Sequence, residues 1–299
     1  MTEMEGRISI IIPSLNEGNY LQDTVFNITS TISSTDYEII IVNSGGTQTS
    51  KIEDLDSVHL FNSAIPLSPA QAKNTGASKS SGEILLFTDA HVFFSYGWEY
   101  KILKALRDEN VIISPCITLM GDENIIGCGF KWRNLNMELK WLTDLTQEIH
   151  EIPFAAGACM AVSKRTFEDL GQFDYDFRSW GMEDAEISLR AWTQGCNVLC
   201  DTTNRVSHKF KTNFPYTVSP KDIYYNRIRL CFLHFRSKRL IKYLRHLSRH
   251  LFPITEFNNI LIKLIGSDVL NKREDLFNKR IYTDDWFFEK FHMKGWSYI

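Results

Sequence analysis

The stretch ISIIIPSLNEGNYL, from Ile8 to Leu21, places a β-branched run directly before a helix-like segment. The run ends at Pro13, and apolar side chains then recur at helical spacing from Asn16 to Thr31. The alternation continues, with strand-like runs at 38–42, 58–61 and 83–87 and a helical pattern at 69–80. These runs are apolar throughout, which is typical of strands covered by helices on both faces. The sequence therefore predicts an α/β fold with a central, mostly parallel sheet.

The pattern loosens after Trp98. No element is assigned between residues 115 and 150. The expected elements are helices at 99–108 and 183–194, a strand at 111–114, a buried strand at 154–162 and a short strand at 204–207. The strand at 154–162 contains small residues, which allow a ligand to approach the backbone closely.

The composition is that of a folded, water-soluble protein. Of 299 residues, 43% are apolar and 23% charged, which excludes a disordered or collagen-like chain. No apolar stretch approaches the roughly 20 residues of a membrane span, and Met1 to Arg7 lacks the order of a signal peptide. We therefore expect a cytoplasmic protein. No C-x-x-C pair occurs, so we also expect reduced, mostly buried thiols at Cys116, Cys128, Cys159, Cys196, Cys200 and Cys231.

The charge is distributed unevenly. Residues 221–299 hold 16 Lys and Arg against 8 Asp and Glu, whereas the preceding residues hold 17 against 28. From Asp222 onward we expect a mainly helical tail in which Tyr224 to Arg249 interleaves basic and apolar residues. Such a stretch either contacts an anionic membrane surface or packs onto the body with a basic outer face. Nucleic acid is not an expected partner, because no recognition motif accompanies the charge.

Polar residues follow three of the expected strands. They are the segments 13–17, 43–46 and 88–91. In an open α/β sheet ligands bind beyond the carboxyl ends of the strands, so these segments are candidate binding loops. The chain has neither G-x-x-x-x-G-K-[ST] nor G-x-G-x-x-G, which argues against P-loop and dinucleotide chemistry.

Asp89 and His91 lie two residues apart at a strand end, where a bend aims both side chains at one point. Taken alone, D-x-H is more often a turn with a structural histidine than a metal site. His208, after the strand at 204–207, is a third candidate ligand. One carboxylate and two imidazoles with open positions suit Mn²⁺ better than Mg²⁺, because imidazole is a borderline ligand.

Six strings, taken in order, resemble two related groups of enzymes. Ile8–Leu21, EIIIVNSGG and AQAKNTGASKSSGEILLFTDAH resemble the nucleotide-sugar-binding half of glycosyltransferase family 2 and related GT-A enzymes. FTDAHVFFSYGW, WGMEDAEISLRAW and VSHKFKTNFPYT resemble the catalytic domain of polypeptide N-acetylgalactosaminyltransferases. The resemblance covers residues 8–217. It implies a GT-A catalytic domain over 1–220, with a donor half at about 1–98 and an acceptor half at 99–220, followed by a basic helical extension at 221–299.

The resemblance also assigns residues to the donor site. It implies that the metal ligands are Asp89, His91 and His208, with Mn²⁺ or Mg²⁺ as the cofactor. The residues implied to contact the donor are Pro13, Asn16, Glu17, Asn43, Lys73, Asp89, Gly157 and Ala158. Among these, Pro13, Asn16 and Glu17 line the uridine pocket and Lys73 reaches the diphosphate. Asn43 stands where an aspartate usually holds the base, and Gly157 and Ala158 lie against the donor sugar.

Met182-Glu183-Asp184 departs from the G-E-N of the peptide-modifying relatives. In inverting family 2 enzymes an E-D pair here supplies the base, so Asp184, with Glu183 beside it, is the expected catalytic carboxylate. Two alternatives stay open. These acids simply favour the first turn of a helix, or Asp184 behaves as the amide does in the retaining relatives. Trp180 and Tyr175, close to Phe177, are expected either to stack against the acceptor or to pack in the core.

The resemblance implies a metal-dependent glycosyltransferase that moves a hexosyl or N-acetylhexosaminyl group from a UDP-sugar to a hydroxyl or thiol acceptor, with a peptide or protein favoured. The alternatives are a transferase building polysaccharide or glycolipid at the inner face of the membrane, and a non-catalytic module that binds nucleotide sugars. A nucleotidyltransferase-like reaction is disfavoured, because residues 13–18 contain no basic side chain for a triphosphate.

Overall fold

The computed structural model describes residues 6–33, 35–46, 56–106, 110–211, 218–250, 253–293 and 295–296. Residues 1–5, the end of the helix expected to reach 108, and the part of the VSHKFKTNFPYT string at 212–217 lie outside this range. The strands are β1 (Ile8–Ser14), β2 (Tyr37–Asn43), β3 (Val58–Asn62), β4 (Ile84–Thr88), β5 (Val92–Phe94), β6 (Val111–Leu119), β7 (Asp122–Gly127), β8 (Phe130–Trp132), β9 (Leu139–Trp141), β10 (Ile149–Glu151), β11 (Cys159–Ser163) and β12 (Asn197–His208). The helices are α1 (Asn19–Thr31), α2 (Pro69–Lys79), α3 (Trp98–Ala105), α4 (Lys164–Asp169), α5 (Glu183–Thr193), α6 (Pro220–His234), α7 (Ser237–His250), α8 (Ile254–Ile265), α9 (Val269–Asn278) and α10 (Asp284–Lys290).

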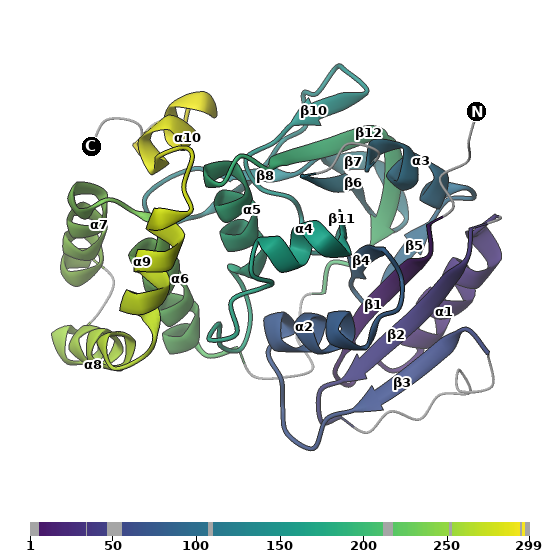
Figure 1. Cartoon of the computed structure of the whole chain (residues 1–299), viewed down its shortest axis with the longest axis horizontal. Helices are drawn as coiled ribbons and strands as arrows, with labels where there is room; N and C mark the ends of the chain where they lie inside the picture. The colour runs from purple at the N-terminus through teal and green to yellow at the C-terminus, as the bar shows by residue number, and fades with distance from the viewer. Residues whose placement is uncertain are drawn as a thin grey trace.

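One large sheet runs through the molecule, with helices packed around it (Figure 1). Its order is β10-β12-β6-β11-β4-β1-β2-β3, with β5 added to β12 and β7 to β6. β1 pairs in parallel with β2 and β4, and β2 pairs in parallel with β3. This half confirms the parallel α/β prediction. In the other half β11 runs antiparallel to both β4 and β6, so the sheet is mixed.

The strand expected at 154–162 is shorter in the structure. β11 begins only at Cys159, and residues 154–158 form a loop across the end of β4. The Ala158 carbonyl accepts the Asp89 N–H at 3.0 Å and the Thr88 hydroxyl at 3.1 Å. The loop is therefore bound to the strand end that carries Asp89, which is why its buried, apolar sequence resembles a strand.

The tail is helical, as expected, and shares the core of the sheet domain. One cluster of buried side chains extends from Ile11 in β1 to Trp296 near the C-terminus. The segment expected as a single basic amphipathic stretch divides into α6, which is largely buried, and α7, whose outer face is basic. α6 contacts α5 and the helices α7, α8 and α9. For α6, the structure therefore supports the alternative in which the tail packs onto the body of the protein.

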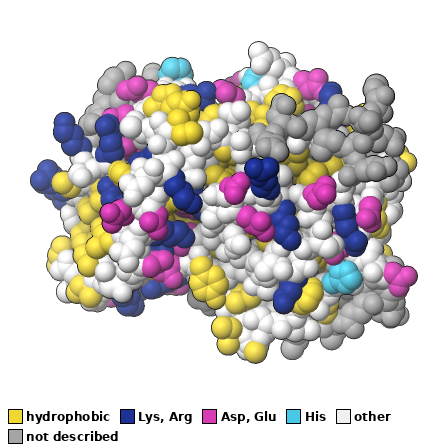
Figure 2. Space-filling view, viewed as in Figure 1, with side chains coloured by type: hydrophobic (Ala, Val, Ile, Leu, Met, Phe, Trp, Pro, Cys, Tyr) yellow, Lys and Arg dark blue, Asp and Glu magenta, His cyan; other side chains and the backbone are white. Residues whose placement is uncertain are grey.

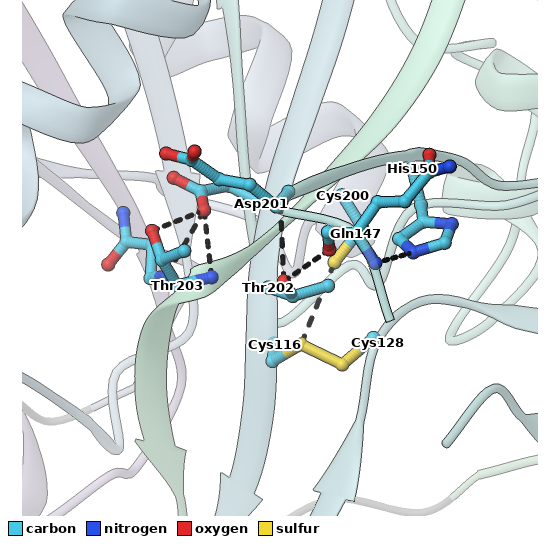
Figure 3. The surroundings of a disulfide bond; sticks show 10 residues. Cys116, Cys128, Gln147, His150, Cys200, Asp201, Thr202 and Thr203 are labelled. Atoms are coloured by element: carbon cyan, nitrogen blue, oxygen red, sulfur yellow. Dashed lines mark hydrogen bonds between the residues drawn. A yellow bond between two sulfur atoms is a disulfide. The ribbon is translucent and has the colours of Figure 1, made fainter. Parts of the chain in front are cut away.

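The cysteine prediction was partly wrong, because Cys116 and Cys128 form a disulfide (Figure 3). β6 and β7 are antiparallel with Ile117 opposite Gly127, so the hairpin register places the two cysteines across from each other. Their 12-residue separation carries no recognisable spacing signal. The Cys200 Sγ on β12 lies 3.8 Å from the Cys116 Sγ. The other four cysteines are buried free thiols, as predicted.

No helix among the described residues is both long and apolar enough to cross a membrane.

Candidate active site

A cleft of about 1010 Å³ opens at the carboxyl ends of β1 and β4. β1 ends at Ser14 and β4 at Thr88, and the residues that follow each strand line the cleft. The loop at 156–158, the start of α5 and the end of β12 complete its wall. Parallel strands on either side of a reversal in strand order leave such a crevice between their following loops.

The structure brings Asp89, His91 and His208 together, although 119 residues separate the first and the last. β12 pairs antiparallel with β5, and His208 lies opposite Val92, which places it beside His91. The His208 Nε2 lies 3.1 Å from the Asp89 Oδ2, and the His91 Nε2 lies 3.8 Å from the same oxygen. One candidate ligand atom from each residue falls within 4.8 Å of the others. This donor set suits Mn²⁺.

Glu17 holds His91 in the orientation that a metal ligand needs. The Glu17 Oε2 lies 3.2 Å from the His91 Nδ1, which leaves the Nε2 facing Asp89. A carboxylate behind a histidine in this way fixes the tautomer and orients the ring. Lys211 also forms an ion pair with Glu17. Glu17 lines the cleft, as a uridine contact would, but its carboxylate is engaged by His91 and Lys211.

Charge around Asp89 favours its ionised form. Burial alone would raise the pKa of Asp89, but the hydrogen bond from His208 and the charges on His91, His208 and Lys73 outweigh it and hold that pKa well below its usual range. Burial likewise opposes the ionisation of Glu17, and His91 and Lys211 lower the Glu17 pKa in spite of it. Both carboxylates are therefore ionised at neutral pH.

Lys73 is buried beneath the cleft and does not line it. Its Nζ donates to the Glu183 Oε1 at 3.3 Å and to the Gly157 carbonyl at 3.4 Å. Burial would lower the pKa of Lys73, but the carboxylates of Glu183, Asp89 and Asp184 raise it overall. The contact of Lys73 with the diphosphate stays a prediction. In the structure, Lys73 holds Glu183 and neutralises part of the acid cluster.

Asp184 lies in the first turn of α5 and faces the cleft. Its Oδ2 accepts the Gly157 N–H at 3.1 Å, and its Oδ1 accepts the Ala185 N–H at 2.7 Å. A Cβ at Gly157 would approach the Asp184 Oδ2 to 3.1 Å, so a small residue there leaves room for the carboxylate. Burial, then the neighbouring Glu183 charge, raises the pKa of Asp184 to about 7, against the opposing effects of Lys73 and the two N–H donors.

Met182 precedes this pair with a left-handed backbone, at φ 78°. It stands where the G-E-N of the peptide-modifying relatives has a glycine, the residue that takes this conformation without a Cβ clash. A non-glycine residue in this region costs of order 1–2 kcal/mol. The turn that presents Glu183 and Asp184 is therefore kept in spite of the substitution.

Asn43, the residue expected to hold the base, forms hydrogen bonds within the protein. The Asn43 side chain is buried and donates to the Asn62 Oδ1 and to the Gly46 carbonyl, both at 2.8 Å. Its Oδ1 accepts the Gly46 N–H at 3.2 Å. Asn16 is exposed beside Gly46, with φ 54°. Pro13 and Ser44 line the cleft, whereas Asn16 and Asn43 are not part of its described lining.

The aromatic residues before α5 separate into two groups. Trp180 is 43% exposed and lines the cleft, as expected of an acceptor contact. Tyr175 is exposed but lies outside the described lining, and its carbonyl accepts from Gln71. Phe177 is buried in the core, as the packing alternative expects, and it also contributes to the lining of the cleft.

Several cleft residues were not anticipated from the sequence. Lys211 forms an ion pair with Glu17, and Arg178 and Arg227 also line the cleft. The Arg178 guanidinium stacks 3.5 Å from the Tyr225 ring centre, and Asn226 binds the backbone of residue 178. These arginines belong to a loop and to α6, so only the tertiary packing of the tail brings them to the site. The β8–β9 hairpin, in the stretch left unassigned, adds Trp132 and Trp141.

Comparison with known proteins gives this geometry a context. Residues 9–171 match the model of glycosyl transferase family 2. The chain belongs to this family. Residues 146–216 also match the model described as the N-terminal domain of galactosyltransferase, which covers the segment holding Asp184 and His208.

Two animal proteins illustrate the similarity of this family 2 chain to curated relatives. Polypeptide N-acetylgalactosaminyltransferase 3 of Drosophila melanogaster is 29% identical over 168 residues, covering 49% of this chain and 25% of that protein. Polypeptide N-acetylgalactosaminyltransferase 4 of Mus musculus is 30% identical over 185 residues, covering 55% and 31%. The chain thus spans less than a third of the length of either relative.

A solved structure establishes the fold. The crystal structure of GalNAc-T7 with UDP, GalNAc and Mn²⁺ superposes with a TM-score of 0.78 at 22% identity, covering 97% of this chain and 57% of that one. The expected GT-A fold is therefore confirmed, and the coverage includes the C-terminal helices.

Proposed function

We propose that this family 2 chain transfers a hexosyl or N-acetylhexosaminyl group from a UDP-sugar to a hydroxyl or thiol of a peptide or protein, using Mn²⁺ or Mg²⁺. The observation that carries the proposal is the convergence of Asp89, His91 and His208 with Asp184 in one cleft. UDP, a sugar and Mn²⁺ in the GalNAc-T7 structure support the donor and the metal. The names of the curated relatives support a peptide acceptor.

The metal would be held by Asp89, His91 and His208, and it would supply positive charge for the departing diphosphate. The chain adds its own positive charge through Lys211, which lies at the same end of the cleft. Glu17 keeps His91 oriented, and its ion pair with Lys211 places that ammonium beside the metal ligands. Together, the metal and Lys211 would stabilise the negative charge of the departing diphosphate.

Asp184 would take the proton from the acceptor. It faces the cleft, and each of its oxygens keeps a lone pair after accepting one backbone N–H. A pKa of about 7 suits a general base at neutral pH. Glu183, held by Lys73, stays beside it and raises that pKa. A base on the acceptor side implies attack from the face opposite the diphosphate, and hence inversion at the anomeric carbon.

The acceptor would lie against Trp180 and the wall that carries Arg178 and Arg227. An aromatic face next to polar donors is a common platform for sugars and peptides. Gly157 and Ala158 line the cleft between this wall and Asp89, in the place where a donor sugar would lie. The acceptor hydroxyl then approaches Asp184 from the side away from the metal ligands.

The experiment is a panel of UDP-sugars, each incubated with and without Mn²⁺ and with a library of Ser, Thr and Cys peptides. We expect metal-dependent transfer from one donor, detected as released UDP and as a mass increase of one sugar on the peptide. Metal-dependent UDP release without a modified peptide would keep the transferase and reject the peptide acceptor. No binding of any UDP-sugar in a thermal shift and no release would reject the transferase and favour a binding module for another ligand.

A further inference from the structure

α7 carries a row of basic side chains that the proposed reaction does not use. Lys238, Lys242, Arg245 and Arg249 recur at intervals of four, three and four residues, which places them on one face of the helix. All four are exposed. The buried residues Arg239, Tyr243 and Leu247 occupy the opposite face. The basic row therefore faces away from the protein core.

This basic row is unfavourable for the helix itself. Like charges three or four residues apart repel each other, and α7 contains no acidic residue to offset them. Within the described part of the chain, none of the four side chains forms an ion pair. Arg239 on the buried face shows the contrast, because it pairs with Asp284 and Asp285. The arrangement is that of a surface whose counter-charge comes from another molecule.

Large apolar side chains lie next to the basic row. Ile241 in α7 is 48% exposed. α8 packs against α7 and exposes Ile254, Ile262 and Ile265, at 57%, 69% and 56%. Figure 2 shows dark blue side chains at the end of the molecule where α7 lies, with yellow side chains beside them over α8. Glu256 at the start of α8 is already paired with Lys221.

We propose that α7 and α8 form a surface that binds an anionic lipid bilayer. The basic row, about 16 Å long by helical rise, meets the headgroups, and the exposed isoleucines enter the boundary between headgroups and acyl chains. The isoleucines decide between bilayer and nucleic acid, because a phosphate backbone offers nothing to cover them. Since α6 leads from the cleft residue Arg227 into α7, this contact keeps the cleft close to the membrane.

The test is co-sedimentation of the full chain with vesicles of phosphatidylcholine alone or with about one third phosphatidylserine. We expect binding to the anionic vesicles only, weakened at high salt. The variant K238Q/K242Q/R245Q/R249Q removes four charges at about five-fold each, so binding should fall at least 100-fold. The single variant Lys242→Gln should lower it about five-fold, and Ile262→Asn should weaken it without changing its salt dependence.

A matched variant, K79Q/K104Q/K140Q/R205Q, removes four exposed charges from the sheet domain and should bind as the unchanged protein does. Circular dichroism checks that each variant folds, and the single substitutions test the proposal if a quadruple variant does not. Equal binding to neutral and anionic vesicles, or equal loss in both quadruple variants, would overturn the proposal. The proposal would also be overturned if the protein did not bind vesicles but bound a polyanion such as poly(U). It would likewise be overturned if the protein did not bind vesicles but formed a dimer through α8. None of these outcomes depends on glycosyl transfer.

Discussion

Replacing Asp184 by Asn tests the identity of the base. Asparagine keeps the size of the side chain but has one acceptor oxygen, so its amide group faces either the Gly157 or the Ala185 N–H. That unmade bond costs roughly 1–3 kcal/mol. The loss of a carboxylate whose ionisation burial opposes acts in the other direction, so the free energy of unfolding should change little at neutral pH. The larger effect is on catalysis, because a positioned base contributes about 10²–10⁴-fold. Turnover should fall by that factor, while UDP-sugar binding stays within a few-fold.

The pH dependence makes the same test quantitative. With a pKa of about 7, the ionised fraction of Asp184 rises from roughly 9% at pH 6 to roughly 91% at pH 8. kcat/KM, which reports the free enzyme, should therefore rise about ten-fold over that range and lose this dependence in Asp184→Asn. The assay is initial-rate UDP release at saturating Mn²⁺, with the anomer of the product read by NMR.

Asp222→Asn is the matched control. Asp222 also lines the cleft and also lies in the first turn of a helix, α6, so the variant changes charge without removing the base. It should keep turnover within a few-fold. Turnover in Asp184→Asn within a few-fold of the unchanged protein, or a product that retains the donor configuration, would refute Asp184 as the base.

Three further changes probe the surroundings of the site. Lys73→Met removes a charge that lowers the pKa of Asp184, so the midpoint of the kcat/KM profile should move up by about one pH unit. An unchanged midpoint would contradict this effect of the Lys73 charge on Asp184. Glu186→Gln strips the buried partners Arg190 and His234 of their carboxylate, and should cost about 3–5 kcal/mol, or at least roughly 6 °C in Tm. Burial opposes the ionisation of Glu186, but Arg190 and His234 hold its pKa well below 4.5. The stability that the Glu186 carboxylate adds is therefore present above pH 4.5 and is lost progressively below it. The free energies of unfolding of Glu186→Gln and the unchanged protein should accordingly converge as the pH falls below 4.5. Cys128→Ser should lower stability by about 2–3 kcal/mol without reductant and by little in its presence; an equal loss in both would assign the effect to packing instead of the disulfide.

The parts of the fold that follow local rules could be predicted from the sequence. β1, β2, β4, α1 and α2 begin and end within a few residues of their expected bounds, because apolar runs and helical spacing are local signals. The antiparallel insertion of β11 between β4 and β6 carries no such signal, since strand order depends on tertiary contacts. The residues at 154–158 show the limit, because burial alone makes a loop resemble a strand.

The site divides in the same way. The sequence predicts that Asp89, His91 and His208 act together because they follow strand ends in recognisable motifs, and the register of β5 with β12 does bring them together. The contacts of Lys73 and Asn43 could not be read from motifs, because both depend on which neighbour lies within hydrogen-bonding distance. Arg178 and Arg227 were missed because the packing of α6, and not any local pattern, brings them into the cleft.

The metal site is the claim on which the proposed function depends most directly. Isothermal titration of Mn²⁺ into the protein with UDP present measures it without needing the acceptor. We expect one site per chain in the unchanged protein, loss of that site in His208→Ala, and its retention in His59→Ala, whose histidine lies on the exposed face of β3 away from the cleft. Equal Mn²⁺ affinity in His208→Ala and the unchanged protein would contradict the account.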